Sequence, residues 1–126
     1  MIRVCFVCLG NICRSPLAEG LFIHIARDRG VLDRYLVDSA GTGAWHVGKP
    51  ADPRSIAVAR AHGLHLPSIA RQVDPETDFH RFDLILAADE SNLRDARAIR
   101  PAGATAKLRL MLDLLPGRGG EGVTDP

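Results

Sequence analysis

The residues with the clearest chemical potential lie in one short segment near the N-terminus, from Cys8 to Ser15. A thiol, Cys8, stands six positions before Arg14, with a glycine and an asparagine between them. A thiolate is a strong nucleophile, a guanidinium binds two oxygens of an oxyanion, and glycine permits close backbone approach. These residue types at this spacing predict a site where a cysteine attacks a bound oxyanion.

The segments on either side supply the scaffold that such a site needs. Residues 2–8 are apolar and β-branched and predict a buried strand. Ser15 and Pro16 predict the N-cap and first position of a helix that ends at Gly30. Apolar residues recur four apart along this helix, at Leu17, Leu21 and Ile25. The helix N-terminus adds backbone N–H groups and a positive dipole end, which favour a bound anion and should hold Cys8 as a thiolate.

The rest of the chain alternates between strands and helices. Strands are expected at residues 35–40, 82–88 and 107–112, and helices are expected at 53–63 after an Asp52 cap and from Ser91 to Pro101. This alternation predicts one α/β domain over residues 1–126, with three layers, a flavodoxin-like four-stranded parallel sheet and the phosphate-binding loop after the first strand. Residues 116–126 are expected to form a loop.

Composition excludes several other classes of protein. The chain has 126 residues, 46% of them hydrophobic and 25% charged, with a formal net charge of +1, as in ordinary globular domains. No apolar stretch reaches the ~18 residues of a membrane span, and the balanced charges leave no footprint for nucleic acid. The three cysteines are too clustered to staple a secreted fold, so a cytoplasmic location is expected. The protein is also expected to be a monomer. His62 and His65 are expected at the surface rather than at a metal.

Residues 7–19, Val-Cys-Leu-Gly-Asn-Ile-Cys-Arg-Ser-Pro-Leu-Ala-Glu, resemble the signature of the low-molecular-weight protein tyrosine phosphatases. Further segments resemble the same family at residues 39–42, 45–48, 52–54, 70–72, 82–83 and 89–93. The resemblance implies hydrolysis of phosphotyrosine, in proteins or as small aryl phosphates, through a cysteinyl-phosphate intermediate. It implies no metal or other cofactor, and a loop that also binds free phosphate or sulfate.

The resemblance also implies a role for each matching residue. Cys8 is the expected nucleophile, Arg14 the group that holds the phosphate and the transition state, and Asp125 the general acid. Leu9 and Trp45 are expected to line a slot for the phenyl ring. The residues expected to bind substrate are Leu9, Gly10, Asn11, Ile12, Cys13, Ser15 and Trp45. Asn11 and Ser15 are also expected to order the loop and the thiolate. The expected supporting residues are Ser39, Asp89 and Asn92.

Three features distinguish this chain within the resemblance. Ile12 stands where tyrosine-directed members carry Ile and arginine-phosphate-directed members carry Thr, which favours phosphotyrosine. Ser68 stands where many members have His, so a supporting hydrogen bond to the loop is expected to differ. The family pattern continues past Asp125 and Pro126 with tyrosines and a closing helix, which lie outside this sequence.

Other interpretations of the same residues remain. A protein arginine phosphatase or an arsenate reductase of the same fold would use a similar loop, although the arsenate relay needs later cysteines and none follows Cys13. A non-enzymatic phosphotyrosine binder would need neither Cys8 nor Asp125, and without the resemblance Asp125 would be an exposed loop carboxylate. A dithiol or zinc pair of Cys5 and Cys8 is disfavoured because residues three apart on a strand face opposite ways, so Cys5 is expected in the core.

Overall fold

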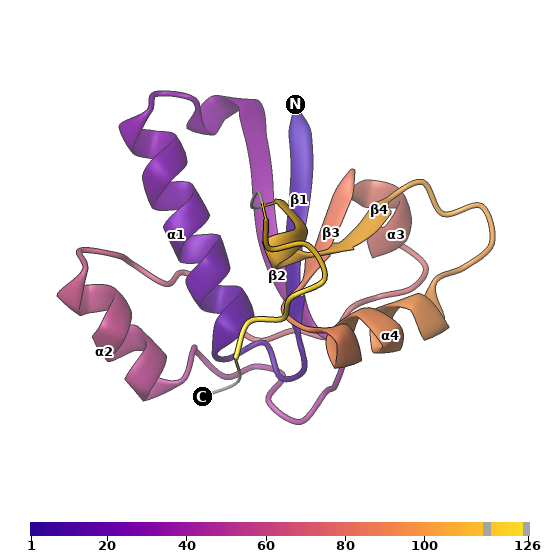
Figure 1. Ribbon diagram of the computed structural model, residues 1–126. Coiled ribbons are helices and arrows are strands. Elements are labelled where there is room, and N and C mark those ends of the chain that lie inside the picture. The colour runs from indigo at the N-terminus through magenta and orange to yellow at the C-terminus, as the bar shows by residue number, and fades with distance from the viewer. Residues whose placement is uncertain (115–116, 125–126) are drawn as a thin grey trace.

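The computed structural model describes residues 1–114 and 117–124. Four parallel strands form one sheet in the order β2-β1-β3-β4. The strands are β1 (Ile2–Cys8), β2 (Tyr35–Gly41), β3 (Leu84–Ala87) and β4 (Lys107–Leu110). The helices are α1 (Arg14–Asp28), α2 (Pro53–Ala61), α3 (Asp78–Arg81) and α4 (Glu90–Ile99), as Figure 1 shows. The expected α/β fold with a four-stranded parallel sheet is confirmed.

Helices cover both faces of the sheet because β1 is apolar on both sides. Val4 and Phe6 pack on one face with residues that include Phe22 of α1. Cys5 and Val7 pack on the opposite face in a second cluster, which includes Phe79, Phe82, Ile85 and Ala106. The expectation that Cys5 belongs to the core is confirmed, since only 1% of it is exposed.

The strand order places a crevice at the end of β1. The connection through α1 carries the chain to β2 on one side of β1, and β3 lies on the other side. In sheets of this kind, ligands bind at the carboxyl ends of the strands where the order reverses. Figure 1 shows the loop after β1, the start of α1 and the start of α4 at this same edge of the sheet.

Two strands are shorter than the apolar runs that predicted them. Phe82 is buried but precedes β3, because it follows the unexpected short helix α3 and packs in the core from outside the ladder. Residues beyond β4 turn into a 3₁₀ helix, Met111–Leu114. An apolar run predicts which residues are buried. It does not predict where a strand ends, because strand ends are set by hydrogen bonds between strands.

The face of α1 that packs on the sheet is not the face that the spacing of Leu17, Leu21 and Ile25 predicted. Leu21 and Ile25 are 46% and 42% exposed, so this expected apolar stripe faces outward. The stripe that faces the sheet begins with the buried Ser15 and Glu19 and continues through Phe22 and Ala26. Polar residues therefore begin the buried face of α1, where it approaches the loop after β1.

Candidate active site

The carbonyl groups of the loop between β1 and α1 accept hydrogen bonds from neighbouring segments of the chain. Three of its oxygens accept neighbouring N–H groups, Cys8 O from Thr42 at 3.0 Å, Leu9 O from Gly43 at 2.9 Å and Ile12 O from Asp52 at 2.7 Å. A carbonyl and the N–H that follows it point opposite ways across a trans peptide. The N–H groups of Gly10 and Cys13 are thus turned away from these outer segments.

The end of β2 and the loop after β1 approach each other closely, which requires a small residue in β2 and an unusual torsion angle in the loop. A Cβ at Gly41 would lie 2.7 Å from the carbonyl oxygen of Leu9, so glycine is required where β2 passes the loop. Asn11 has a positive φ of 56°. Asparagine is among the few residues that adopt this left-handed conformation readily.

The loop encloses a pocket of about 170 Å³. Its lining is Cys8, Leu9, Gly10, Ile12, Cys13, Arg14, Trp45 and His46. The structure thus brings Trp45 to the same pocket as the loop residues, with 71% of its side chain surface exposed, whereas Cys8 and Arg14 are buried. His46 was not singled out from the sequence. It packs on Gly10, where a Cβ would lie 2.9 Å from its ring.

A buried hydrogen-bond chain leads from Cys8 into the protein. The amide nitrogen of Asn11 donates to Ser15 Oγ at 2.8 Å and to Ser39 Oγ at 2.9 Å. Because both serine oxygens accept from Asn11, their own hydrogens are directed onward. Ser15 lies 3.0 Å from Cys8 Sγ, and Ser39 donates to Glu19 Oε1 at 2.5 Å. Asn11 therefore orients the Ser15 hydroxyl to donate to the sulfur, as a thiolate requires.

The expectation that Ser15 caps α1 is wrong. The helix begins at Arg14 and its N-cap residue is Cys13, whose side chain makes no capping hydrogen bond. Ser15 lies in the first turn, where its hydroxyl is committed to Cys8 and Asn11. The positive end of the helix adjoins the loop, where an anion is the natural complement.

Arg14 is held in place by the segments that follow β3 and β4. Its Nη1 donates to Asp89 Oδ2 at 2.7 Å and to the Val123 carbonyl at 2.9 Å, and only 7% of the residue is exposed. Burial would raise the pKa of Asp89, but the hydrogen bond from Arg14 and the N–H of Asn92 lower it below its ordinary value. A carboxylate that stays charged keeps the guanidinium oriented at the pocket.

Asp89 also begins α4, which corrects the expectation that Ser91 does so. Its Oδ1 accepts the Asn92 N–H at 2.8 Å, and the helix runs from Glu90. With its amide nitrogen toward Asp89 at 3.0 Å, the Asn92 side chain accepts the Leu9 N–H at 3.3 Å. The cap of α4 thus contacts both Arg14 and the loop.

Two supporting residues were missed from the sequence. Glu19 is only 5% exposed and ends the chain of hydrogen bonds from Cys8; burial raises its pKa, although the Ser39 hydrogen bond opposes that rise. The Arg71 N–H donates to Asn11 Oδ1 at 3.0 Å. Glu19 lies four residues after Ser15, a spacing that places both on one helix face, so this signal was available.

Ser68 provides no hydrogen bond to the loop. Its hydroxyl is buried and faces Glu19 instead, where it opposes the rise in the pKa of that carboxyl. The amide of Asn11 is instead held by Ser15, Ser39 and the backbone of Arg71.

The expected general acid, Asp125, lies outside the described residues. The segment just before it does reach the pocket. Val123 donates its N–H to the Ala88 carbonyl at 2.7 Å and accepts from Arg14, and a Cβ at Gly122 would lie 2.9 Å from Asp89 Cβ.

Residues 1–114 and 117–124 contain neither a metal-binding cluster nor a helix that could span a membrane. No group of three or more histidine, cysteine or acidic residues there could hold a metal ion. No helix within these ranges has both the length and the apolar character for crossing a bilayer.

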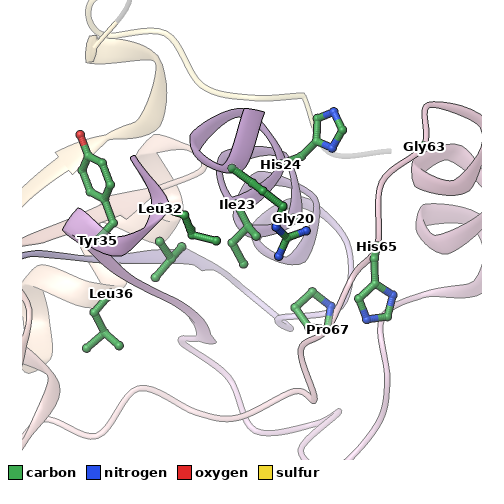
Figure 2. Close-up of a pocket in the computed structure, with 11 residues that line it drawn as sticks. Gly20, Ile23, His24, Leu32, Tyr35, Leu36, Gly63, His65 and Pro67 are labelled. Carbon is green, nitrogen blue, oxygen red and sulfur yellow. The ribbon is translucent and has the colours of Figure 1, made fainter. Parts of the chain in front are cut away.

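A second cavity of about 410 Å³ lies between α1, the start of β2 and residues 63–67 (Figure 2). Ile23, Leu32 and Leu36 contribute to its lining, with His24 and His65. Among the described residues, no cysteine, serine or carboxylate lines this cavity, whereas the loop pocket contains Cys8.

Comparison with known proteins agrees with this geometry. The family model described as low molecular weight phosphotyrosine protein phosphatase matches residues 3–126. A low molecular weight phosphotyrosine protein phosphatase from Schizosaccharomyces pombe is 47% identical over 110 residues, which are 86% of this chain and 70% of that protein.

Solved structures with the same fold include phosphatases of two kinds. A protein tyrosine phosphatase from Entamoeba histolytica superposes with a TM-score of 0.92 at 36% identity, over 100% of this chain and 80% of that one. A Drosophila arginine phosphatase superposes with a TM-score of 0.80 at 37% identity, over 86% of this chain and 70% of that one. From the matched family model and these relatives, the chain belongs to the low molecular weight phosphotyrosine protein phosphatase family, a family of hydrolases.

Proposed function

We propose that the chain hydrolyses phosphotyrosine in proteins through a phosphate ester of Cys8. The observation that carries this proposal is the 3.0 Å contact between Cys8 Sγ and a Ser15 hydroxyl whose orientation is set by Asn11. The sulfur lies in the same pocket as Arg14, which is positioned by Asp89. Nucleophile and anion-binding groups therefore share one loop.

In the first step the phosphoryl group binds against the loop N–H groups and the fork of Arg14. The Cys8 thiolate attacks phosphorus, an S–P bond forms, and the bond from phosphorus to the tyrosyl oxygen breaks. Asp125 donates a proton to the departing oxygen. The approach of Val123 to Arg14 supports this role, because it brings the chain two residues before Asp125 to the pocket.

In the second step water attacks the phosphorus of the cysteinyl phosphate. Asp125, now a carboxylate, accepts a proton from that water, and the S–P bond breaks to release inorganic phosphate. The departing sulfur regains its negative charge and the hydrogen bond from Ser15. Arg14 and the loop N–H groups neutralise the charge that a metal would neutralise in other phosphoryl transfers, so a metal-independent reaction is proposed.

The slot above the loop favours a flat aromatic leaving group. Leu9 and Trp45 line the pocket at exposed positions, where apolar surfaces suit a phenyl ring. Ile12 lines it as well. Phosphoarginine is the second candidate, because an arginine phosphatase is among the structures that superpose on this chain. We propose a cytoplasmic location, where a reactive thiol stays reduced.

Turnover of para-nitrophenyl phosphate, a phosphotyrosine peptide and a phosphoarginine peptide tests the proposal, with and without a metal chelator. The phosphotyrosine rate should exceed the phosphoarginine rate and be insensitive to the chelator. Quenching with acid should trap a phosphorylated protein that Cys8→Ser does not form. A faster phosphoarginine rate would replace the proposed substrate, and loss of activity with chelator would exclude the metal-independent mechanism.

A further inference from the structure

An open groove adjoins the loop pocket on the side of α2. It has a volume of about 470 Å³, and the residues that line it include Ile12, His46, Lys49, Pro50, Pro53 and Ile56. Two of them, Ile12 and His46, also line the loop pocket. The groove therefore lies directly beside the pocket in which we propose that phosphotyrosine binds.

The walls of the groove are fixed by backbone hydrogen bonds and by the cap of α2. The backbone hydrogen bonds run from the Asp52 N–H to the Ile12 carbonyl at 2.7 Å and from the Ala70 N–H to the Lys49 carbonyl at 2.8 Å. Asp52 also caps α2 by accepting the Arg54 N–H at 2.8 Å. A preorganised surface loses little conformational entropy on binding, so even a small contact adds affinity.

The chemistry of the groove is apolar with one available positive charge. Ile12, Pro53 and Ile56 present hydrocarbon surface. Lys49 is exposed and forms no ion pair with another residue that the structure describes. Asp52 is the single acidic residue in the lining, and its Oδ1 already accepts from the backbone and guanidinium of Arg54.

We propose that this groove binds an apolar side chain next to the phosphotyrosine of a protein substrate, and that Lys49 pairs with an acidic residue beyond it. The inference rests on the proposed function, because it extends the same site. It assigns the substrate class as phosphotyrosine within an apolar and acidic sequence. A free aryl phosphate is too small to use the groove.

Peptides of equal length test the preference without any change to the protein. Each peptide has four variable positions, two before and two after the phosphotyrosine. The first carries leucine then glutamate after the phosphotyrosine, and the second carries glutamate then leucine before it. The third has serine at all four positions. One of the first two should exceed the third in kcat/KM by about tenfold, the usual gain from one buried aliphatic group with an ion pair. Equal kcat/KM values for all three would overturn the inference.

Variants locate the preference in the groove. Ile56→Ser should reduce the ratio of kcat/KM for the preferred peptide to that for para-nitrophenyl phosphate by about tenfold. Lys49→Gln should remove the contribution of glutamate, about threefold at low salt. Val58→Ser is the matched control, because Val58 is exposed on α2 but does not line the groove, and its ratio should stay at the wild-type value.

The outcomes separate this inference from the proposed function. If the wild type hydrolyses para-nitrophenyl phosphate but Ile56→Ser and Val58→Ser change the ratio equally, the groove is not the binding site and the proposed function stands. If the wild type hydrolyses no aryl phosphate at all, the proposed function fails and the inference fails with it.

Discussion

Two polar clusters lie on opposite faces of the sheet and meet at Asn11. The first, the loop cluster, consists of Cys8, Asn11, Ser15, Ser39 and Glu19. The second, the ion cluster, consists of Arg71, Asp38 and Asp78. In it Arg71 binds both carboxyl oxygens of Asp78, at 2.9 and 3.2 Å, and its Nε donates to Asp38 at 3.2 Å. The N–H of Arg71 joins the two clusters through Asn11.

A cysteine lies at each cluster, Cys5 at the ion cluster and Cys8 in the loop cluster, and their surroundings differ. Cys5 lies 3.8 Å from an Arg71 nitrogen, yet burial raises the pKa of its thiol more strongly than Arg71 lowers it. Cys8 is three residues away on the other face, where an oriented hydroxyl and a helix N-terminus meet its sulfur. A neighbouring cation alone does not make a thiol reactive; hydrogen-bond donors that face the sulfur are also needed. We expect substitutions at Arg14 and at the loop-cluster residues that contact the sulfur to affect catalysis, and substitutions in the ion cluster to affect stability.

The largest effect is expected for Arg14→Lys. An ammonium can still pair with Asp89 but cannot bind two phosphate oxygens, so kcat/KM for para-nitrophenyl phosphate should fall by about 10³. The free energy of unfolding, measured with urea, should change by less than about 1 kcal/mol. Retention of more than a tenth of the activity would show that Arg14 acts through its charge alone.

The matched substitution in the ion cluster is Arg71→Lys. A lysine cannot hold Asp38 and Asp78 together, which leaves a buried carboxylate poorly paired, so the free energy of unfolding should fall by about 3 kcal/mol. The folded fraction should keep most of its kcat, because the backbone N–H that holds Asn11 remains. If Arg71→Lys lowered kcat as much as Arg14→Lys does, the two clusters would not be separable.

Ser15→Ala should have a smaller effect, confined to catalysis. The lost hydrogen bond to a charged sulfur is worth about 1.5–3 kcal/mol, so kcat should fall by roughly 10- to 100-fold. Ser55→Ala is the control, since Ser55 is also a buried helical serine but lies outside the loop cluster. An equal loss of kcat in both variants would point to general destabilisation of the fold rather than to the sulfur.

The reactive loop could be predicted from the sequence because its determinants are local. Cys8, Gly10 and Arg14 lie within seven positions, between an apolar strand and a helix start. The role of Ser15 could be predicted only in part, because its contact with the sulfur was expected but the helix cap does not form. For Glu19 the only local signal is its spacing of four residues from Ser15. Serine before proline is typical of a helix cap, and glutamate on a helix is usually solvated. Ser15 is held instead by Asn11, four positions before it, and Glu19 accepts from Ser39, which lies 20 positions away.

The start of α4 also could not be predicted from the local sequence. Asp89 and Ser91 are both suitable N-caps, and the sequence alone favours neither by much. Asp89 is the cap because its second oxygen also accepts from Arg14, which lies 75 positions earlier in the chain. The parallel sheet was predictable from alternation, whereas the choice among local caps depended on a distant partner.

The smallest effect is expected for Glu19→Gln and is visible only in the pH dependence of stability. Burial raises the pKa of Glu19 in the folded state, with Asp38 adding to the rise and Ser39 and Arg71 opposing it. The folded protein then binds this proton more tightly than the unfolded chain does. The stability it contributes is complete below the unfolded pKa, near the ordinary value of about 4.3, and is lost as the pH rises through the folded pKa. The free energy of unfolding of the wild type should fall across that interval.

Glutamine does not titrate but still accepts a hydrogen bond from the Ser39 hydroxyl. The free energy of unfolding of Glu19→Gln should therefore vary less with pH than that of the wild type over this interval. Urea unfolding at several pH values measures the difference. Glu76→Gln, at an exposed position before α3, should follow the wild-type curve. If Glu19→Gln also kept the wild-type slope, Glu19 would not be the titrating group, and the loop cluster would differ from the ion cluster in catalysis alone.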